Sequence, residues 1–227
     1  MPDTPINVLY LGNLITGGAE LYLVRLIRTI DRRKLNITFT IMGKFDLPDQ
    51  MPEGVELIQL VDTPSTLSSA WKYWVLIFRL IRIMKIRNIQ IVHTNHLGIN
   101  SLYAQVAAKS LGLHTIETLQ HAYPARSRTD DVLIRNPIAR IIRNGLVDQF
   151  VSLGDVLYKE QSLIWKIPQS KLFLSKMGVG TEYFTHRGPD QRRQALLSTG
   201  IQPECTVLGF IGRAIPLKGL HKIFLLM

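Results

Sequence analysis

The chain has 227 residues, of which 46% are hydrophobic and 19% charged. This balance is that of a globular protein and excludes a disordered chain, a collagen and a coiled coil. The one cysteine, Cys205, excludes an internal disulfide framework and fits a reducing compartment. No apolar run approaches the roughly 20 residues of a membrane-spanning helix, and the first residues lack the cationic segment of a signal peptide. We therefore expect a cytoplasmic protein.

The net charge of +10 is concentrated in the middle of the chain. Residues 65–145 hold eleven Lys and Arg against three acidic residues, a net charge of +8. Uneven positive charge predicts an anionic partner: nucleic acid, a phosphorylated substrate or an anionic membrane surface. A solvated basic face with no partner is the alternative. No recognition helix, RNA-binding motif or zinc-binding spacing supports nucleic acid, so we expect no nucleic-acid partner.

Short β-branched runs alternate with longer amphipathic stretches along most of the chain. The pattern predicts strands at 6–12, 37–42, 55–60, 89–94, 115–120, 149–153 and 172–176, and helices at 19–30, 67–87, 100–111, 131–144 and 155–165. Strands that alternate with helices indicate βαβ units, and hence an α/β fold with a Rossmann-like parallel sheet and helices on both faces. Ligands of such sheets bind beyond the carboxyl ends of the strands.

The pattern changes after residue 180. Residues 181–200 are polar, with a short helix at 190–198, and are predicted to form a linker. A strand at 206–212 and a helix from 217 onward restart the alternation. One strand and part of one helix cannot bury a core. We therefore expect residues 1–180 to form a complete domain and residues 201–227 to be the first βα unit of a truncated second Rossmann-like domain.

A glycine-containing turn, Gly12-Asn-Leu-Ile-Thr-Gly-Gly-Ala-Glu20, joins the first strand to the first helix. Gly17 and Gly18 would let a ligand approach the backbone closely, and the free amides of a helix start favour phosphate or carboxylate. The spacing fits neither the dinucleotide fingerprint nor the P-loop. A tight turn without a ligand is an equal alternative.

A second turn, Gly212–Gly219, contains Arg213 and Lys218. Two cations in one turn are suited to neutralising a diphosphate, Arg through its planar fork and Lys as a point charge. Solvated surface charges are the equal alternative.

His121 follows a predicted strand, in Leu119-Gln-His-Ala-Tyr-Pro124. There it would face a cleft and hold or deprotonate a hydroxyl. The alternative, favoured for any single histidine, is a structural side chain bonded within a turn. His93 and His96 suggest a metal site, but no third ligand with a suitable spacing is near. We expect those two to line the cleft or a turn.

Six segments occur in an order that resembles the retaining, sugar-nucleotide-dependent glycosyltransferases of family 4, which have the GT-B fold. These segments are Gly17–Glu20, Val92–Asn95, Leu119–His121, Val151–Asp155, Lys176–Phe184 and Gly212–Gly219. The resemblance extends over nearly the whole chain. It implies two Rossmann-like domains that face a cleft. The N-terminal domain receives the acceptor, and the C-terminal domain holds most of the nucleotide-sugar donor.

The resemblance also implies roles for five residues of this chain. Gly17 and Gly18 would line the cleft near the donor phosphates and the acceptor, and His121 would lie beside the transferred sugar. Arg213 and Lys218 would neutralise the departing diphosphate, where negative charge develops. Because these two cations do so, neither a metal nor another cofactor is expected in the site.

The chain departs from that family in two respects. The pair of glutamates separated by seven residues, which belongs to the C-terminal domain, is absent, and Met177 and Gly180 stand where the family has Asn and an acidic residue. We therefore expect a glycosyltransferase by family, acting on a glycan or lipid-linked acceptor, whose 227-residue chain alone is inactive. The alternative is a non-catalytic Rossmann-like binding module or a degenerate gene product.

The predicted helix at 67–87 suggests a membrane partner, since it has no acidic residue. Its cations within an arc of about 140° are Lys72, Arg79, Arg82 and Lys85. With aromatic residues among them, residues 71–86 suit docking on anionic lipid headgroups, and the arginines of 132–143 would extend the patch. The protein would then be peripheral on the inner face of the membrane. The alternative is a helix packed on the sheet with its charges in water.

Overall fold

The structure is a computed structural model, and it describes residues 4–14, 18–45, 51, 53–61, 70–95, 99–119, 136–178, 181, 188–212 and 219–224. The chain divides into two units, Met1–Met177 and Gly178–Met227, and each is described by itself.

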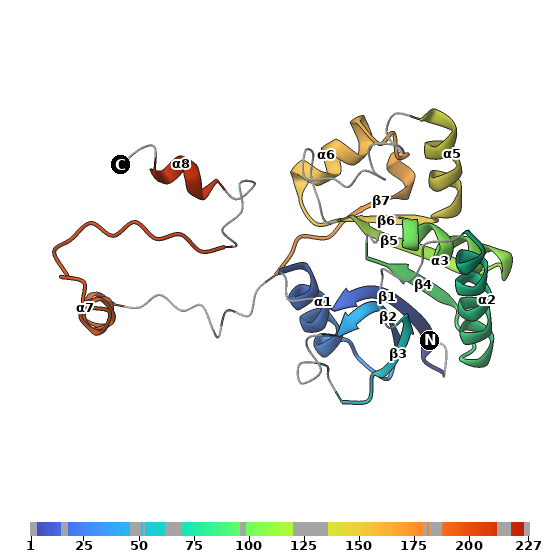
Figure 1. The fold of residues 1–227 in the computed structure, drawn as a ribbon, viewed down its shortest axis with the longest axis horizontal. Coiled ribbons are helices and arrows are strands. Elements are labelled where there is room, and N and C mark those ends of the chain that lie inside the picture. Colours follow the sequence, from blue (N-terminus) through green and yellow to red (C-terminus); the bar gives the residue numbers. More distant parts are fainter. Residues whose placement is uncertain are drawn as a thin grey trace. The chain divides into compact units, whose positions relative to one another are not determined.

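Seven parallel strands form one sheet in the first unit (Figure 1). They are β1 (Ile6–Leu14), β2 (Leu35–Phe45), β3 (Glu56–Val61), β4 (Ile91–Thr94), β5 (His114–Leu119), β6 (Gln149–Ser152) and β7 (Leu172–Leu174). Their order is β3-β2-β1-β4-β5-β6-β7. The chain moves outward from β1 to β3 and then returns to the other side of β1. The predicted parallel α/β sheet is confirmed, and the reversal between β1 and β4 is the switch point at which such sheets bind ligands.

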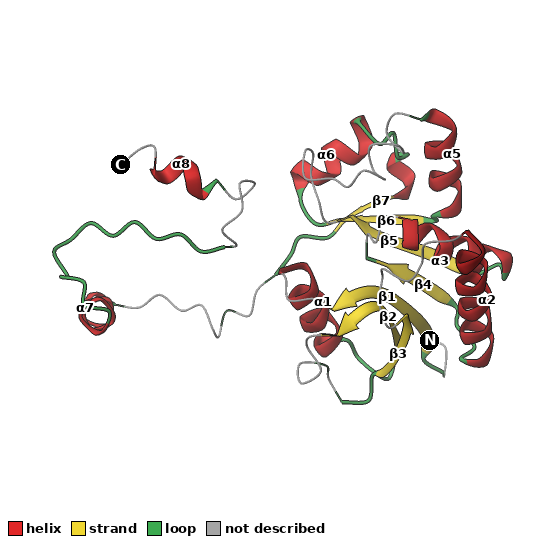
Figure 2. Cartoon of the chain, in the orientation of Figure 1, coloured by secondary structure: helices red, strands yellow, loops and turns green. Residues whose placement is uncertain are grey.

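Helices cover both faces of this sheet (Figure 2). They are α1 (Gly18–Thr29), α2 (Ala70–Ile86), α3 (Ile99–Ser110), α5 (Pro137–Leu146) and α6 (Asp155–Leu163). Successive residues of a strand point to opposite faces, so β1 supplies two cores. Val8 and Tyr10 pack with α1, whereas Leu9 and Leu11 pack with α2 and α3. Both sets of side chains are buried, which explains why β1 is an uninterrupted apolar run.

The structure corrects several predicted element ends: β2 is longer than the predicted 37–42, and β7 ends at Leu174 instead of 176. β1 continues to Leu14, beyond the predicted end at Gly12, and its pairing with β2 is irregular between these two residues. At Gly12 an added Cβ would lie 3.0 Å from Cζ of Phe39, so a larger residue would fit there only if the Phe39 ring shifted. The helix predicted at 131–144 is described from Pro137 onward, and Asn136 caps it.

The described residues of the second unit contain two helices, α7 (Pro189–Ser198) and α8 (Leu220–Phe224). α7 confirms the helix predicted at 190–198. Residues 206–212, predicted as a strand, carry no strand. A strand needs a neighbour to satisfy its backbone groups, and no other strand is present among the described residues of this unit. The predicted linker and second domain stay predictions.

Candidate functional site

The candidate site lies at the carboxyl edge of the sheet, around the switch point between β1 and β4. β1 ends at Leu14 and α1 begins at Gly18. The backbone N–H of Asn95, directly after β4, donates to the carbonyl of Leu11 at 3.0 Å. The end of β4 is thus bonded to Leu11, three residues before the end of β1, so β1 extends farther toward this edge than β4 does.

A neutral histidine lies just below this edge. Nε2 of His93 is 2.7 Å from Oγ1 of Thr118 and 3.3 Å from the hydroxyl of Tyr10. The rings of His93 and Tyr10 have centroids 4.2 Å apart. Burial lowers the pKa of His93 to about 3 and raises the pKa of Tyr10. His93 therefore joins β1, β4 and β5 as an uncharged hydrogen-bonding group and is not suited to proton transfer near neutral pH.

Two of the sequence motifs meet where β6 ends. The buried hydroxyl of Ser152 donates to the carbonyl of Gly154 at 3.2 Å and shapes the turn into α6. Nζ of Lys176 lies 3.4 Å from Oδ2 of Asp155, the first residue of α6. Both of these side chains are mostly exposed, so their ion pair adds little stability. It nevertheless places the motif at 151–155 beside the start of the motif at 176–184.

The structure describes one of the five predicted site residues. Gly18 is the first residue of α1, as the predicted strand–turn–helix requires. Gly17, His121, Arg213 and Lys218 lie outside the described residues, so their roles stay predictions. Within the described part of the chain, no cluster of three His, Cys, Asp or Glu side chains is placed to hold a metal.

Sequence reasoning missed the contact between Tyr10, His93 and Thr118. Residues two apart on a strand share a face, so the alternation could have placed each side chain on one face of its own strand. The missing information was the strand order. β4 pairs with both β1 and β5, and this neighbourhood brings together residues about 80 and 25 positions apart.

A buried ion pair lies on the other face of the sheet, beneath α5. Nη2 of Arg143 donates to Oε1 of Glu117 at 2.9 Å, and the two side chains are 4% and 2% exposed. The guanidinium also lies 4.9 Å from the ring centroid of Phe150 and 4.8 Å from that of Trp165. α5 therefore turns this arginine toward the sheet and away from water.

This burial corrects the predicted basic patch at 132–143. Arg143 adds no exposed charge, because Glu117 and two aromatic rings enclose it. Arg140 is half-buried, and Arg135 lies outside the described residues. In α2, Arg79, Arg82 and Lys85 are all exposed, and Nη1 of Arg79 also donates to the carbonyl of Leu60 at 2.6 Å. No helix in the described part of the chain is long and apolar enough to span a bilayer.

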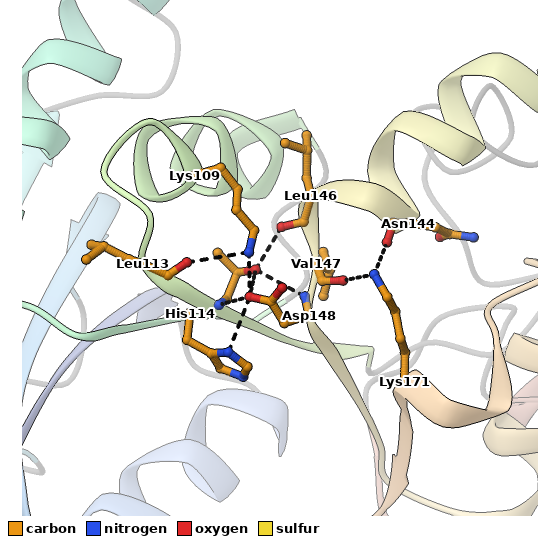
Figure 3. A network of polar contacts seen from close by, with 9 residues as sticks. Lys109, Leu113, His114, Asn144, Leu146, Val147, Asp148 and Lys171 are labelled. Carbon is orange, nitrogen blue, oxygen red and sulfur yellow. Dashed lines mark hydrogen bonds and ion pairs between the residues drawn. The ribbon is translucent and has the colours of Figure 1, made fainter.

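A second polar network lies at the amino edge of the sheet (Figure 3). Oδ2 of Asp148 accepts hydrogen bonds from Nζ of Lys109 at 2.5 Å and from the backbone N–H of Thr115 at 2.8 Å. Nδ1 of His114 lies 3.4 Å from the same oxygen. Burial would raise the pKa of Asp148, but the bonds from Lys109 and Thr115 outweigh it and hold this pKa below its usual value. The network joins α3, β5 and β6 at the edge opposite the candidate site.

A surface hollow of about 670 Å³ also lies at the amino edge. Its walls include Ile6, Ile30, Asp31 and Leu35, from the starts of β1 and β2 and the turn between α1 and β2. Because parallel α/β sheets bind ligands at the carboxyl edge, we do not assign the hollow to the candidate site.

The chain matches no family model and no curated protein sequence, but it does match solved structures. A glycosyltransferase from Rickettsia africae gives a TM-score of 0.64 at 13% identity, over 87% of this chain and 50% of that one. MurG from Acinetobacter baumannii gives 0.54 at 12% identity, over 86% and 54%. A UDP-GlcNAc 2-epimerase from Neisseria meningitidis, bound to UDP-GlcNAc, gives 0.53 at 14% identity, over 85% and 54%.

This chain therefore spans about half the length of each of these proteins. At such low identity the likeness establishes the fold alone. The expected fold class is confirmed, while membership of family 4 and retention of stereochemistry stay predictions. The described fold of the first unit is the Rossmann-like α/β architecture of one half of a GT-B protein.

Proposed function

We propose that the chain is the acceptor-side half of a glycosyltransferase that uses a nucleotide-sugar donor. The observation that carries this proposal is the seven-stranded sheet, which reverses between β1 and β4 and matches one half of a glycosyltransferase from R. africae. MurG supports it with a similar match. The order of the six motif segments supports the finer assignment to family 4, with retention of stereochemistry.

The proposed reaction occurs at the carboxyl edge of the sheet. Gly18 is the first residue of α1, and the free amides at a helix start favour a negatively charged ligand. Gly17, which precedes it in the sequence, would line the cleft beside it. His121 follows β5 and would lie beside the transferred sugar. Arg213 and Lys218 would neutralise the departing diphosphate without a metal ion. The acceptor in this proposal is a glycan or a lipid-linked glycan.

A nucleotide-sugar epimerase is the second candidate. The epimerase from N. meningitidis shares the fold almost as well as MurG does, with TM-scores of 0.53 and 0.54. The two candidates differ in one requirement, since a transferase needs an acceptor and an epimerase does not. A non-catalytic module is the third candidate, because the described residues of 178–227 contain no strand that could build a second sheet.

The test uses the protein isolated from its own cells, incubated with UDP-glucose, UDP-N-acetylglucosamine or GDP-mannose. Released nucleotide and altered sugar are measured with and without a lipid extract as acceptor. Nucleotide release that depends on the extract supports the transferase. Interconversion of the sugar without the extract supports the epimerase. Neither activity with any donor, in isolated protein that does bind a nucleotide sugar or the extract, supports the binding module.

Site variants then locate the reaction. We expect His121→Ala to lower the rate roughly 100-fold or more, the usual contribution of a positioned acid or base. The matched control is His114→Ala, at the amino edge, which should leave the rate unchanged. Arg213→Ala and Lys218→Ala should each slow nucleotide release, whereas Lys222→Ala, an exposed lysine of α8, should not. Equal losses in the variants and their controls would contradict the assignment.

A further inference from the structure

α5 has one of its two arginines, Arg143, buried and its three isoleucines exposed. Ile138, Ile141 and Ile142 are 68%, 68% and 54% exposed, whereas Arg143 is 3% exposed. Residues three and four positions apart are neighbours on a helix surface, so the three isoleucines form one continuous strip. A helix that faces water normally carries its polar side chains there. Contiguous exposed apolar surface of this kind indicates an interaction site.

Two sets of contacts hold α5 in this orientation. At its start, Oδ1 of Asn136 accepts hydrogen bonds from the backbone N–H groups of Ile138 and Ala139, at 3.0 and 3.2 Å. Near its end, Arg143 is bonded to Glu117 of β5. Turning the isoleucines toward the sheet would break this buried ion pair, which is strongly unfavourable. The outward strip is therefore imposed by the packing of the domain.

α2 exposes a face of a different kind. Trp74, Phe78 and Ile86 are 63%, 66% and 55% exposed, and they lie among the exposed cations Arg82 and Lys85. Neither α2 nor α5 contains an acidic residue. Side chains of this mixed kind bury their apolar parts in a lipid interface while their charges remain at the headgroups.

The two faces belong to one side of the molecule. α2 and α5 both contact α3, and the three helices lie on the face of the sheet opposite α1 (Figure 1). This side therefore combines an apolar strip, exposed aromatic rings and exposed positive charge. An anionic bilayer complements all three, since its phosphates bind cations and its interface accepts aromatic and aliphatic side chains.

We propose that this docking surface, made of the exposed residues of α5 and α2, binds an anionic lipid bilayer. The isoleucines of α5 enter the headgroup region, and Arg82 and Lys85 of α2 bind lipid phosphates. The proposal thus removes Arg143 from the patch predicted at 132–143 and adds the isoleucines of α5 to it. The inference does not rest on the proposed reaction, because docking is measured without donor or acceptor.

The test is flotation of the full chain with vesicles of phosphatidylcholine alone or mixed with phosphatidylglycerol. We expect binding to the mixed vesicles only, weakening as salt is added because the charges are exposed. The triple variant Ile138→Ser/Ile141→Ser/Ile142→Ser should bind about tenfold more weakly, since less apolar surface leaves water. Its thermal unfolding should be nearly unchanged, because all three side chains are already exposed.

Matched controls distinguish binding by this surface from non-specific adsorption of exposed apolar side chains. Val156→Ser/Leu163→Ser/Leu197→Ser removes apolar side chains that are equally exposed on α6 and α7. This variant should bind the mixed vesicles like the unmodified chain. Arg82→Gln and Lys85→Gln should each weaken binding about fivefold, the usual effect of one cation near an anionic surface.

Four results would overturn the proposal. They are equal binding to both kinds of vesicle, unchanged binding of the isoleucine variant, and an equal loss in the α6 and α7 control. The fourth is a dimer, seen by sedimentation without lipid, that the isoleucine variant dissociates, because a second copy of the chain would then cover the surface.

Discussion

Two ion pairs connect neighbouring parts of the same half-sheet, one buried and the other partly in water. Glu117 and Arg143 are 2% and 4% exposed, whereas Asp148 and Lys109 are 30% and 28% exposed. Both pairs join a helix to the region of β5 and β6, and both are within hydrogen-bond distance. They differ in what happens when one partner is lost. A buried charge left alone cannot regain water, while a partly exposed one is resolvated.

The buried pair also belongs to a larger network. Oε2 of Glu117 accepts a hydrogen bond from Nε2 of Gln105 at 2.8 Å, and that amide lies 3.3 Å from Oγ1 of Thr94. Nη1 of Arg143 has no hydrogen-bond partner within the described part of the chain. Its positive charge is stabilised by the ion pair with Glu117 and by cation–π contacts with the rings of Phe150 and Trp165. Removing the carboxylate charge should therefore have a large effect.

The largest expected effect is that of Glu117→Gln. The substitution keeps the shape but leaves Arg143 buried without an opposite charge, so we expect the free energy of unfolding to fall by about 3–5 kcal/mol. Urea denaturation at pH 7 measures this. The control is Glu53→Gln, an exposed carboxylate of the same unit, which should change little. If Glu117→Gln lowered the free energy of unfolding less than Asp148→Asn does, the buried pair would not be the more sensitive of the two, contrary to our expectation.

His93 extends the comparison to a half-buried ionisable group that hydrogen-bonds to hydroxyls. Its pKa of about 3 in the folded state lies below the value of about 6.5 expected when unfolded. Between about pH 6.5 and pH 3 the histidine is protonated in the unfolded chain but not in the folded one. The free energy of unfolding therefore has its full value above about pH 6.5 and falls as the pH is lowered toward 3. We expect a loss of about 2 kcal/mol between pH 7 and 5 from this residue.

His93→Gln should remove that part of the pH dependence, measured as urea midpoints at both pH values. The matched control is His221→Gln, an exposed histidine of α8, which should retain the full dependence. If the His93 variant keeps the same slope, the histidine is not buried in its neutral form.

A smaller effect is expected for Asp148→Asn. At pH 7 the variant loses the charge-assisted bonds from Lys109 and Thr115, which should cost about 1–2 kcal/mol at this partly exposed site. Because the folded-state pKa of Asp148 is lowered, its contribution is present above the unfolded value near 4 and disappears as the pH falls below it. The difference between variant and parent should accordingly shrink in acid. A difference that is independent of pH would show that charge is not its cause.

The smallest effect is expected for Asp31→Asn. Asp31 pairs with Arg33 at 3.0 Å, but the arginine side chain is 90% exposed. Exposed pairs of this kind contribute little because water and salt screen them. We expect no resolvable change in the urea midpoint at any salt concentration. A clearly lower urea midpoint for the variant at low salt would contradict this expectation and show that the pair stabilises the fold as the Asp148 network does.

Local patterns in the sequence were sufficient for the order of elements and for the parallel sheet. β1 is apolar on both faces, and the strands alternate with helices of crossover length, so the α/β class follows from hydrophobicity along the chain alone. The sequence also predicted which loops gather at the carboxyl edge of the sheet, because parallel strands all end on the same side. Gly18 was correctly placed at the start of a helix on this basis.

Tertiary contacts decided the rest. Strand order brought Tyr10, His93 and Thr118 together, although no local pattern links them. Glu117, 26 positions earlier in the chain, turned Arg143 inward and the isoleucines of α5 outward. Residues 206–212 have the composition of a strand but form none, and the described residues of the second unit contain no other strand for pairing. The physical reason is common to all three. Whether a polar group is satisfied, and hence which side chain faces water, depends on partners far away along the chain.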